Sequence, residues 1–246
     1  MHRCRLLREP ARGEERATFV LRTPIILTAA ALAGALTLSA CGSVKLGAAA
    51  VSDNERISTA TVTNEVNNLN QAYQANKAKI QLQFAASQMP QEVLSWLLRF
   101  KVREQMAQRY GVTVNQTQVQ DALASISAQA KQSGVTAQDL AVANGIPPDQ
   151  INELGRYVAI QQAVLNRLDG GKLPTATPAL QTLSNQFNTS QCEAAKSLGI
   201  QVNPQYGALD YRNIGVVAAP DKLSALPGTP SPAPTGTAAP QLSPHC

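Results

Sequence analysis

The stretch VLSWLLRFKVREQMAQRYGVTVNQTQVQDAL, residues 93–123, decides the fold because it contains most of one helix and the start of another. Pro90, just before it, is favoured in the first turn of a helix, and Gly111 is typical of a helix end. The first half of this helix has little polar face, which indicates a central place in a core. Asn115 and Gln118 form a capping-box pattern, which predicts that the next helix begins there.

Helical periodicity continues on both sides of this stretch. Apolar residues from Val62 to Phe84 recur at spacings of three, four and seven, which predicts one long first helix beginning at Ser58 or Thr59. Three further helices are expected at 137–144, after Pro147-Pro148-Asp149, and from Thr177 to Leu198. Aromatic residues make up only 4% of the chain, which fits helices with polar faces better than a β-sandwich. We therefore expect a mainly α fold.

Short extended segments flank the helices. AAAVSDNERIS, residues 48–58, reads as a brief strand and a turn at Asp53-Asn54, and 200–217 reads as extended chain with a turn. Residues 219–246 are rich in Pro and Ala and cannot form a core, so we expect a disordered tail. The helical module is expected at 48–218.

The basic charge of the chain is concentrated at its N-terminus. Residues 1–40 hold six of the 21 Lys and Arg residues but three of the 16 acidic ones, which leaves the rest nearly neutral. A nucleic-acid-binding protein would keep its basic excess on the folded body, so that class is set aside.

Residues 1–40 have the pattern of a leader and signal peptide. The apolar run from Ile25 to Leu38 is shorter than the roughly 20 residues that cross a bilayer, and it fits the apolar region of a secretory signal. It runs into Leu38-Ser39-Ala40-Cys41, which resembles the lipobox of bacterial lipoproteins. That resemblance implies cleavage before Cys41, a diacylglyceryl group on its sulfur and a spacer at 41–47. The alternatives are a secreted protein with a chance cysteine and an uncleaved anchor.

Two cysteines, Cys192 and Cys246, lie beyond the leader and Cys41. In an oxidising compartment they could form a disulfide. Free thiols and intermolecular pairing remain open alternatives.

Residues for common catalytic sites are missing from the expected body. The two histidines, His2 and His245, lie in the leader and the tail, so Ser-His-Asp and Cys-His catalysis and His-ligated zinc are excluded. There is no phosphate-binding glycine loop and no CxxC pattern. We expect no enzyme activity, no cofactor, no metal and no small-molecule substrate.

Three stretches together resemble the SurA and PrsA class of extracytoplasmic folding factors and, more distantly, the peptide-binding module of trigger factor. They are AAAVSDNERIST (48–59), residues 93–123, and AAKSLGIQVNPQYGALD (194–210). Gln205 stands where the family usually has Arg. The family commonly carries a parvulin prolyl-isomerase domain before its closing helix, but here that gap, 169–178, is far too short for one.

The resemblance implies a SurA-like helical chaperone module that lacks the parvulin domain and is closed by pairing of N- and C-terminal strands. Ala48–Ser52 is expected to pair with extended chain around Gly207–Val217. Such modules present apolar side chains on an arm-like or cradle-like concave surface. Four residues are candidates for client contacts, with ordinary core packing as the alternative: Phe84, Met89, Trp96 and Phe100.

The sequence supports a non-catalytic chaperone, or holdase, for unfolded or newly secreted polypeptides. Its expected location is the extracytoplasmic face of the cell membrane, with Cys41 as the lipid anchor. The alternative is a structural or adaptor lipoprotein that binds one specific protein partner. A peptidyl-prolyl isomerase is a distant third reading.

Overall fold

The computed structural model describes residues 47–53, 55–171, 174–218 and 246. Its helices are α1 (Thr59–Asn76), η1 (Ala86–Gln88), α2 (Met89–Tyr110), α3 (Gln116–Gln132), α4 (Ala137–Ala143), η2 (Pro148–Gln150), α5 (Ile151–Leu168) and α6 (Thr177–Ser197). Its strands are β1 (Ala48–Val51), β2 (Arg56–Ser58), β3 (Gln201–Val202), β4 (Ala208–Asp210) and β5 (Gly215–Val217). The predicted mainly α fold with a small set of strands is confirmed.

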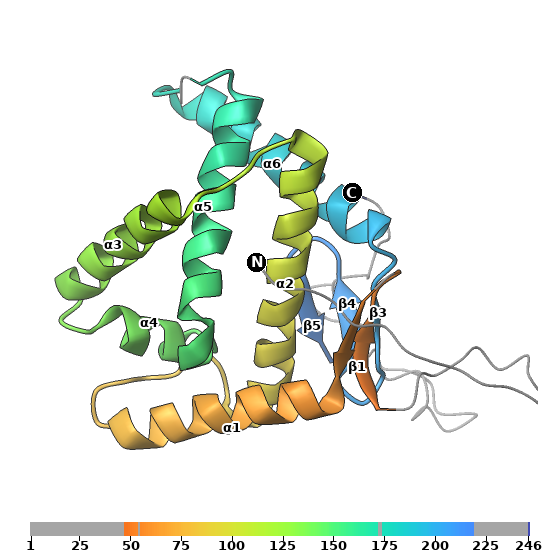
Figure 1. Cartoon of the computed structure of the whole chain (residues 1–246). Coiled ribbons are helices and arrows are strands. Elements are labelled where there is room, and N and C mark those ends of the chain that lie inside the picture. The colour runs from red at the N-terminus through yellow and green to blue at the C-terminus, as the bar shows by residue number, and fades with distance from the viewer. Residues whose placement is uncertain (1–46, 54, 172–173, 219–245) are drawn as a thin grey trace, which may run out of the picture. The chain divides into compact units, whose positions relative to one another are not determined.

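Helix α2 lies at the centre of the body, as its apolar sequence predicts. It packs against α1, α5, α6 and β5, and it stands beside α5 with α1 running across their ends (Figure 1). Val93, Leu94 and Met106 are fully buried in the main core. Pro90 lies in the first turn, and Gly111 ends the helix with a left-handed backbone, φ +61°.

The first helix is shorter than its apolar periodicity predicts. Ser58 caps α1 by accepting a hydrogen bond from the Thr61 N–H at 2.9 Å, but the helix ends at Asn76. Ile80 and Phe84 therefore lie in the connection to η1, which folds back over the core. The Gln83 N–H donates to the carbonyl oxygen of Ala143 at 2.9 Å, so this connection is bonded to the end of α4.

Helices α3 and α5 pack unusually closely. The predicted capping box is present, because Asn115 accepts from the Gln118 N–H at 2.9 Å and the Gln118 side chain accepts from the Asn115 N–H. Gly155 on α5 lies against Leu123 on α3, where a Cβ atom at residue 155 would sit 2.6 Å from Leu123 Cγ. The glycine inside α5, which lowers helix propensity, is therefore explained by the close approach of the two helices.

The strands join the two ends of the body, but the partner of the N-terminal strand differs from the predicted one. Strand β1 lies between β2 and β3 in one antiparallel sheet, and Ala50 pairs with Val202. The expected pairing of Ala48–Ser52 with 207–217 is wrong, because β4 and β5 within that segment pair with each other. Gly207 precedes this hairpin with φ +126°, and a Cβ atom there would clash with the carbonyl oxygen of Val217 at 2.1 Å.

Helix α6 closes the body against α2 and α5. Its cap is Ala176 rather than Thr177, which is the first helical residue, and Pro178 is the second. The structure joins the buried Cys192 of α6 to Cys246 by a disulfide, with 5.7 Å between their Cα atoms.

Candidate functional site

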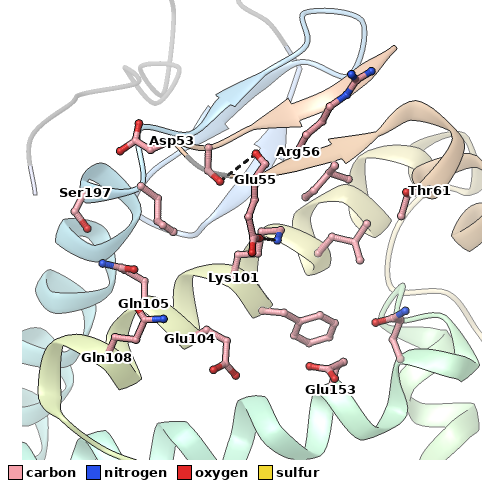
Figure 2. Close-up of a pocket in the computed structure, with 16 residues that line it drawn as sticks. Asp53, Glu55, Arg56, Thr61, Lys101, Glu104, Gln105, Gln108, Glu153 and Ser197 are labelled. Atoms are coloured by element: carbon pink, nitrogen blue, oxygen red, sulfur yellow. Dashed lines mark hydrogen bonds and ion pairs between the residues drawn. The ribbon is translucent and has the colours of Figure 1, made fainter. Parts of the chain in front are cut away.

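A hollow of about 630 Å³ opens where four parts of the chain meet (Figure 2). One side is α2, and the others are the β1–β2 turn with β2 and the first turn of α1, the segment where η2 leads into α5, and the end of α6. We call this hollow the groove. These parts are separated in the sequence, so the groove exists only in the folded protein.

The floor of the groove is apolar. Ile57, Phe100, Leu97 and Leu198 line it from β2, α2 and the end of α6. Ile57 and Phe100 are buried, whereas Leu97 and Leu198 are half-buried and leave apolar surface open to the groove. Covering about 50 Å² of such surface with a bound side chain would contribute roughly 1 kcal/mol.

Side-chain amides form part of the polar walls. The side-chain amides of Gln105 and Gln108, on successive turns of α2, make no hydrogen bond to other described residues, and both side chains lie beside the groove (Figure 2). Gln150 lies at the other end of the groove, where its amide donates to Glu65. A glutamine amide offers both donors and an acceptor, which match the N–H and C=O groups of an extended peptide.

Two ion pairs hold the walls. Glu55, after the β1–β2 turn, pairs with Lys101 of α2 across the groove (Figure 2), and burial lowers the pKa of Lys101. Arg156 of α5 binds Glu104 of α2 through two bonds, Nε to Oε1 at 2.5 Å and Nη2 to Oε2 at 2.8 Å. These bonds to Glu104 raise the pKa of Arg156. The second pair fixes the spacing of α2 and α5 beneath the groove.

Of the four residues predicted to contact clients, only Phe100 lines the groove. Met89 is buried in the main core, so its expected client contact is corrected to core packing. It is the first residue of α2, and its side chain turns inward there. Phe84 is half-buried, with its ring against Gly145 beside α4.

Trp96 is half-buried between α2 and neighbouring helices. Its indole Nε1 donates to the carbonyl oxygen of Asn144 at 2.8 Å, and its ring lies 5.8 Å from those of Phe100 and Tyr157. The Arg99 guanidinium covers the ring at 4.8 Å. Trp96 therefore braces the aromatic cluster behind the groove rather than the groove itself.

Next to this cluster lies a buried arginine. Arg103 is 2% exposed, and its guanidinium lies 4.1 Å from the Tyr157 ring and 4.6 Å from the Phe187 ring. Its Nη2 donates to Gln191 at 3.1 Å, but Nε and Nη1 have no hydrogen-bond partner among the described residues. Burial lowers the pKa of Arg103, because a charged group loses solvation in the interior.

A buried carboxyl pair lies close to the Gln150 end of the groove. Glu65 of α1 is 9% exposed, and Asp149 of η2 lies close enough to raise its pKa. Gln150 Nε2 donates to Glu65 Oε1 at 3.0 Å, and Asn68 Nδ2 donates to Asp149 Oδ2 at 3.1 Å. Burial, with a further contribution from Asp149, raises the pKa of Glu65 to about 7.

Sequence reasoning missed most of the groove. Leu97, Lys101, Gln105 and Gln108 recur every three or four residues on α2, which is a signal for one shared face. Nothing local indicates that Ile57 and the other parts of the chain meet that face, because contacts between distant segments leave no periodic pattern.

Several predicted features lie outside the described residues. They are the leader at 1–40, Cys41 with the spacer as far as residue 46, and the tail at 219–245. Within the described ranges, no helix combines the length and apolar character needed to cross a membrane. In the same ranges, no three His, Cys, Asp or Glu side chains gather as metal ligands would.

Comparison with known proteins gives one match. A family model described as the SurA-like N-terminal domain matches residues 12–164, which is more than half of the chain. The matched range runs through β1 and α1 to most of α5, and α6 with the C-terminal strands follows it. No curated protein and no solved structure matches the chain.

Proposed function

Because the chain belongs to the family of SurA-like N-terminal domains, which are modules of chaperone-type folding factors, we propose that it is a non-catalytic holdase. Its clients are unfolded or newly secreted polypeptides, and the groove is where it binds them. The observation that carries this proposal is the combination of an apolar floor with the unpaired amides of Gln105 and Gln108.

This combination suits clients of many sequences. The floor formed by Leu97, Phe100 and Leu198 accepts an apolar side chain without demanding a particular shape. The amides bind the peptide backbone, which is the same in every client. A hollow of about 630 Å³ accommodates a few residues of extended chain, so binding is weak and reversible.

A lipid on Cys41 would hold the protein at the membrane, where newly secreted clients emerge. The four residues ending at Cys41 support the anchor, and the extracytoplasmic face of the cell membrane is the proposed location. Tethering raises the local concentration of the groove relative to emerging chains, which offsets low intrinsic affinity.

A second candidate function is an adaptor for one protein partner. It is favoured by the small amount of exposed apolar surface, since Leu180 and Val217 are the exposed large hydrophobic residues within the described ranges. A promiscuous chaperone usually offers more such surface, whereas a specific interface can be mostly polar.

An aggregation assay distinguishes the two functions. The full chain, in mild detergent, is mixed with three unrelated denatured enzymes, and light scattering is followed after dilution. A holdase delays aggregation of all three. Failure with all three, together with stoichiometric recovery of one cellular partner, would favour the adaptor.

Variants of the walls test the site. Q105A/Q108A removes two hydrogen-bonding amides from the surface of α2, each worth about 1 kcal/mol, so client affinity should fall about thirtyfold. The matched control is Q120A/Q129A, two exposed glutamines of α3 away from the groove. Equal protection by both double variants would show that the groove is not the client site.

A further inference from the structure

The carboxyl pair of Glu65 and Asp149 connects two elements that are far apart in sequence. Glu65 lies on α1 and Asp149 in η2, and two hydrogen bonds cross between these elements: Gln150 Nε2 donates to Glu65 Oε1 at 3.0 Å, and Asn68 Nδ2 donates to Asp149 Oδ2 at 3.1 Å. These bonds hold the two carboxyl groups near each other, and because two neighbouring ionised carboxylates repel, the arrangement favours a proton on Glu65. The second oxygen of Glu65, Oε2, is buried and has no hydrogen-bond partner among the described residues.

No cation of the described residues contributes to the pKa of Glu65. The other charged residues on elements packed against α1 are Asp139 on α4, Arg56 on β2, and Glu92, Arg99, Lys101, Arg103, Glu104 and Arg109 on α2. None of these is among the causes that shift the pKa of Glu65, which are burial, Asp149 and Gln150. Among the described residues that shift the pKa of Glu65, only Gln150 favours the ionised form, through its hydrogen bond to Oε1.

The pair is directly connected to the groove. Gln150 both lines the groove and donates to Glu65, so one side chain belongs to both sites. Thr61, which also lines the groove, lies on α1 one turn before Glu65. The position of α1 against η2 therefore sets the shape of this end of the groove.

We propose that the Glu65–Asp149 pair makes client binding depend on pH. A proton on Glu65 fixes α1 against η2 and keeps the Gln150 end of the groove preformed. Loss of that proton leaves two carboxylates facing each other, loosens this joint, and lowers the affinity of the groove for extended peptides. The inference rests on the proposed function, because it concerns regulation of the same groove.

The direction of the pH dependence of client affinity follows from the two ionisation states of Glu65. At pH 6 Glu65 is mostly protonated, because its pKa is about 7, and the groove is preformed. At pH 8 Glu65 is mostly ionised, so α1 and η2 are no longer held together, and client binding must first bring them back into contact. A preformed site binds more tightly because binding spends no free energy on ordering it.

Fluorescence anisotropy tests the inference with the full chain in mild detergent. The probe is an acetylated and amidated peptide of Leu, Phe, Ser and Gln, labelled with a pH-insensitive dye, so that the peptide itself does not titrate. We expect wild type to bind it at least about fivefold more tightly at pH 6 than at pH 8. E65Q carries a permanently neutral side chain and should bind tightly at both pH values.

Two further variants separate the joint from general effects of pH. D149N removes the repelling neighbour and should also lose the pH dependence, which gives a second test if E65Q folds poorly. E193Q removes a carboxylate from the exposed ion pair between Glu193 of α6 and Arg109 of α2, neither of which lines the groove, and should keep the full response.

The outcomes distinguish the inference from the proposed function. Equal binding by wild type at pH 6 and pH 8 would overturn the inference and leave the holdase function standing. An unchanged pH response in both E65Q and D149N would overturn it as well. Absence of peptide binding at either pH would overturn the proposed function, and the inference with it.

Discussion

The hydroxyl oxygen of Ser95 accepts a hydrogen bond from the backbone N–H of Val216 at 2.8 Å, in the interior of the protein. The same hydroxyl donates to the Gln91 carbonyl oxygen at 2.7 Å, so its single proton is already in use. This bond connects α2 to the β4–β5 hairpin across 121 positions of sequence. A small polar side chain on the central helix is thus the attachment point of the C-terminal hairpin.

Replacing Ser95 tests this attachment. S95A leaves the Val216 N–H buried without its acceptor, which should lower the free energy of unfolding by about 1–3 kcal/mol. Urea unfolding followed by circular dichroism measures the loss. S125A on the exposed face of α3 is the control and should change little. Equal midpoints for S95A and wild type would mean that the hairpin is held by other contacts.

The buried guanidinium of Arg103 gives a second prediction. R103K keeps a buried charge but loses the planar contacts with Tyr157 and Phe187, so it should destabilise by about 3 kcal/mol. R103M removes the charge and its two unpartnered nitrogens, so it should cost less than R103K. Thermal unfolding ranks the two variants. The reverse order would show that the charge itself stabilises the fold.

The disulfide between Cys192 and Cys246 should stabilise the folded state. It links residues 54 positions apart, for which the chain-entropy model gives about 4 kcal/mol. C246S avoids a cavity, because Cys246 is exposed, and should unfold at lower urea than wild type under oxidising conditions. Wild type in dithiothreitol should match C246S. A midpoint for C246S that equals that of oxidised wild type would contradict this role.

Stability should fall as pH rises, because of Glu65. Its pKa is about 7 in the folded protein and 4.5 when unperturbed, so the folded state binds the proton more tightly. The resulting stabilisation is fully present below pH 4.5 and is lost as pH rises through 7. Between pH 4.5 and 8, the free energy of unfolding should fall by about 1–3 kcal/mol less in E65Q than in wild type, as measured by urea unfolding. A parallel decline in E65Q would assign the effect to other groups.

The lipid anchor is tested at Cys41. We expect mass spectrometry of the mature protein to find Cys41 as the first residue, carrying a diacylglyceryl group. C41S should move the protein from the membrane fraction to the soluble fraction or leave its signal uncleaved. An unmodified Cys41 inside the mature chain would rule out the lipoprotein prediction.

The helices could be predicted where their signals are local. Pro90, Gly111 and the Asn115–Gln118 capping box each act within one turn, and the structure has the corresponding helix ends where the sequence indicates them. The end of α1 could not be predicted in this way. Ile80 keeps the helical spacing although it lies in a loop, because that loop also packs on the core.

The groove and the strand pairing depend on distant contacts. The extended chain after α6 contains two segments that could pair with β1. Because β4 and β5 pair with each other through a turn, the segment that pairs with β1 is Gln201–Val202. Family resemblance indicated a client surface, yet Met89 and Trp96 pack inward. Residue type alone does not distinguish a core aromatic from one that lines a groove.

The pairing of β1 with β3 also sets an order of events during synthesis. Asn203, which follows β3, donates its side-chain amide to the Ala48 carbonyl oxygen across 155 residues. Because the chain emerges with its N-terminus first, β1 is available long before β3, so the helices can form from local contacts before the last strand joins the sheet. The chain thus passes through a state in which the helices have formed but the sheet is incomplete, and the sheet closes only when nearly all of the body has emerged.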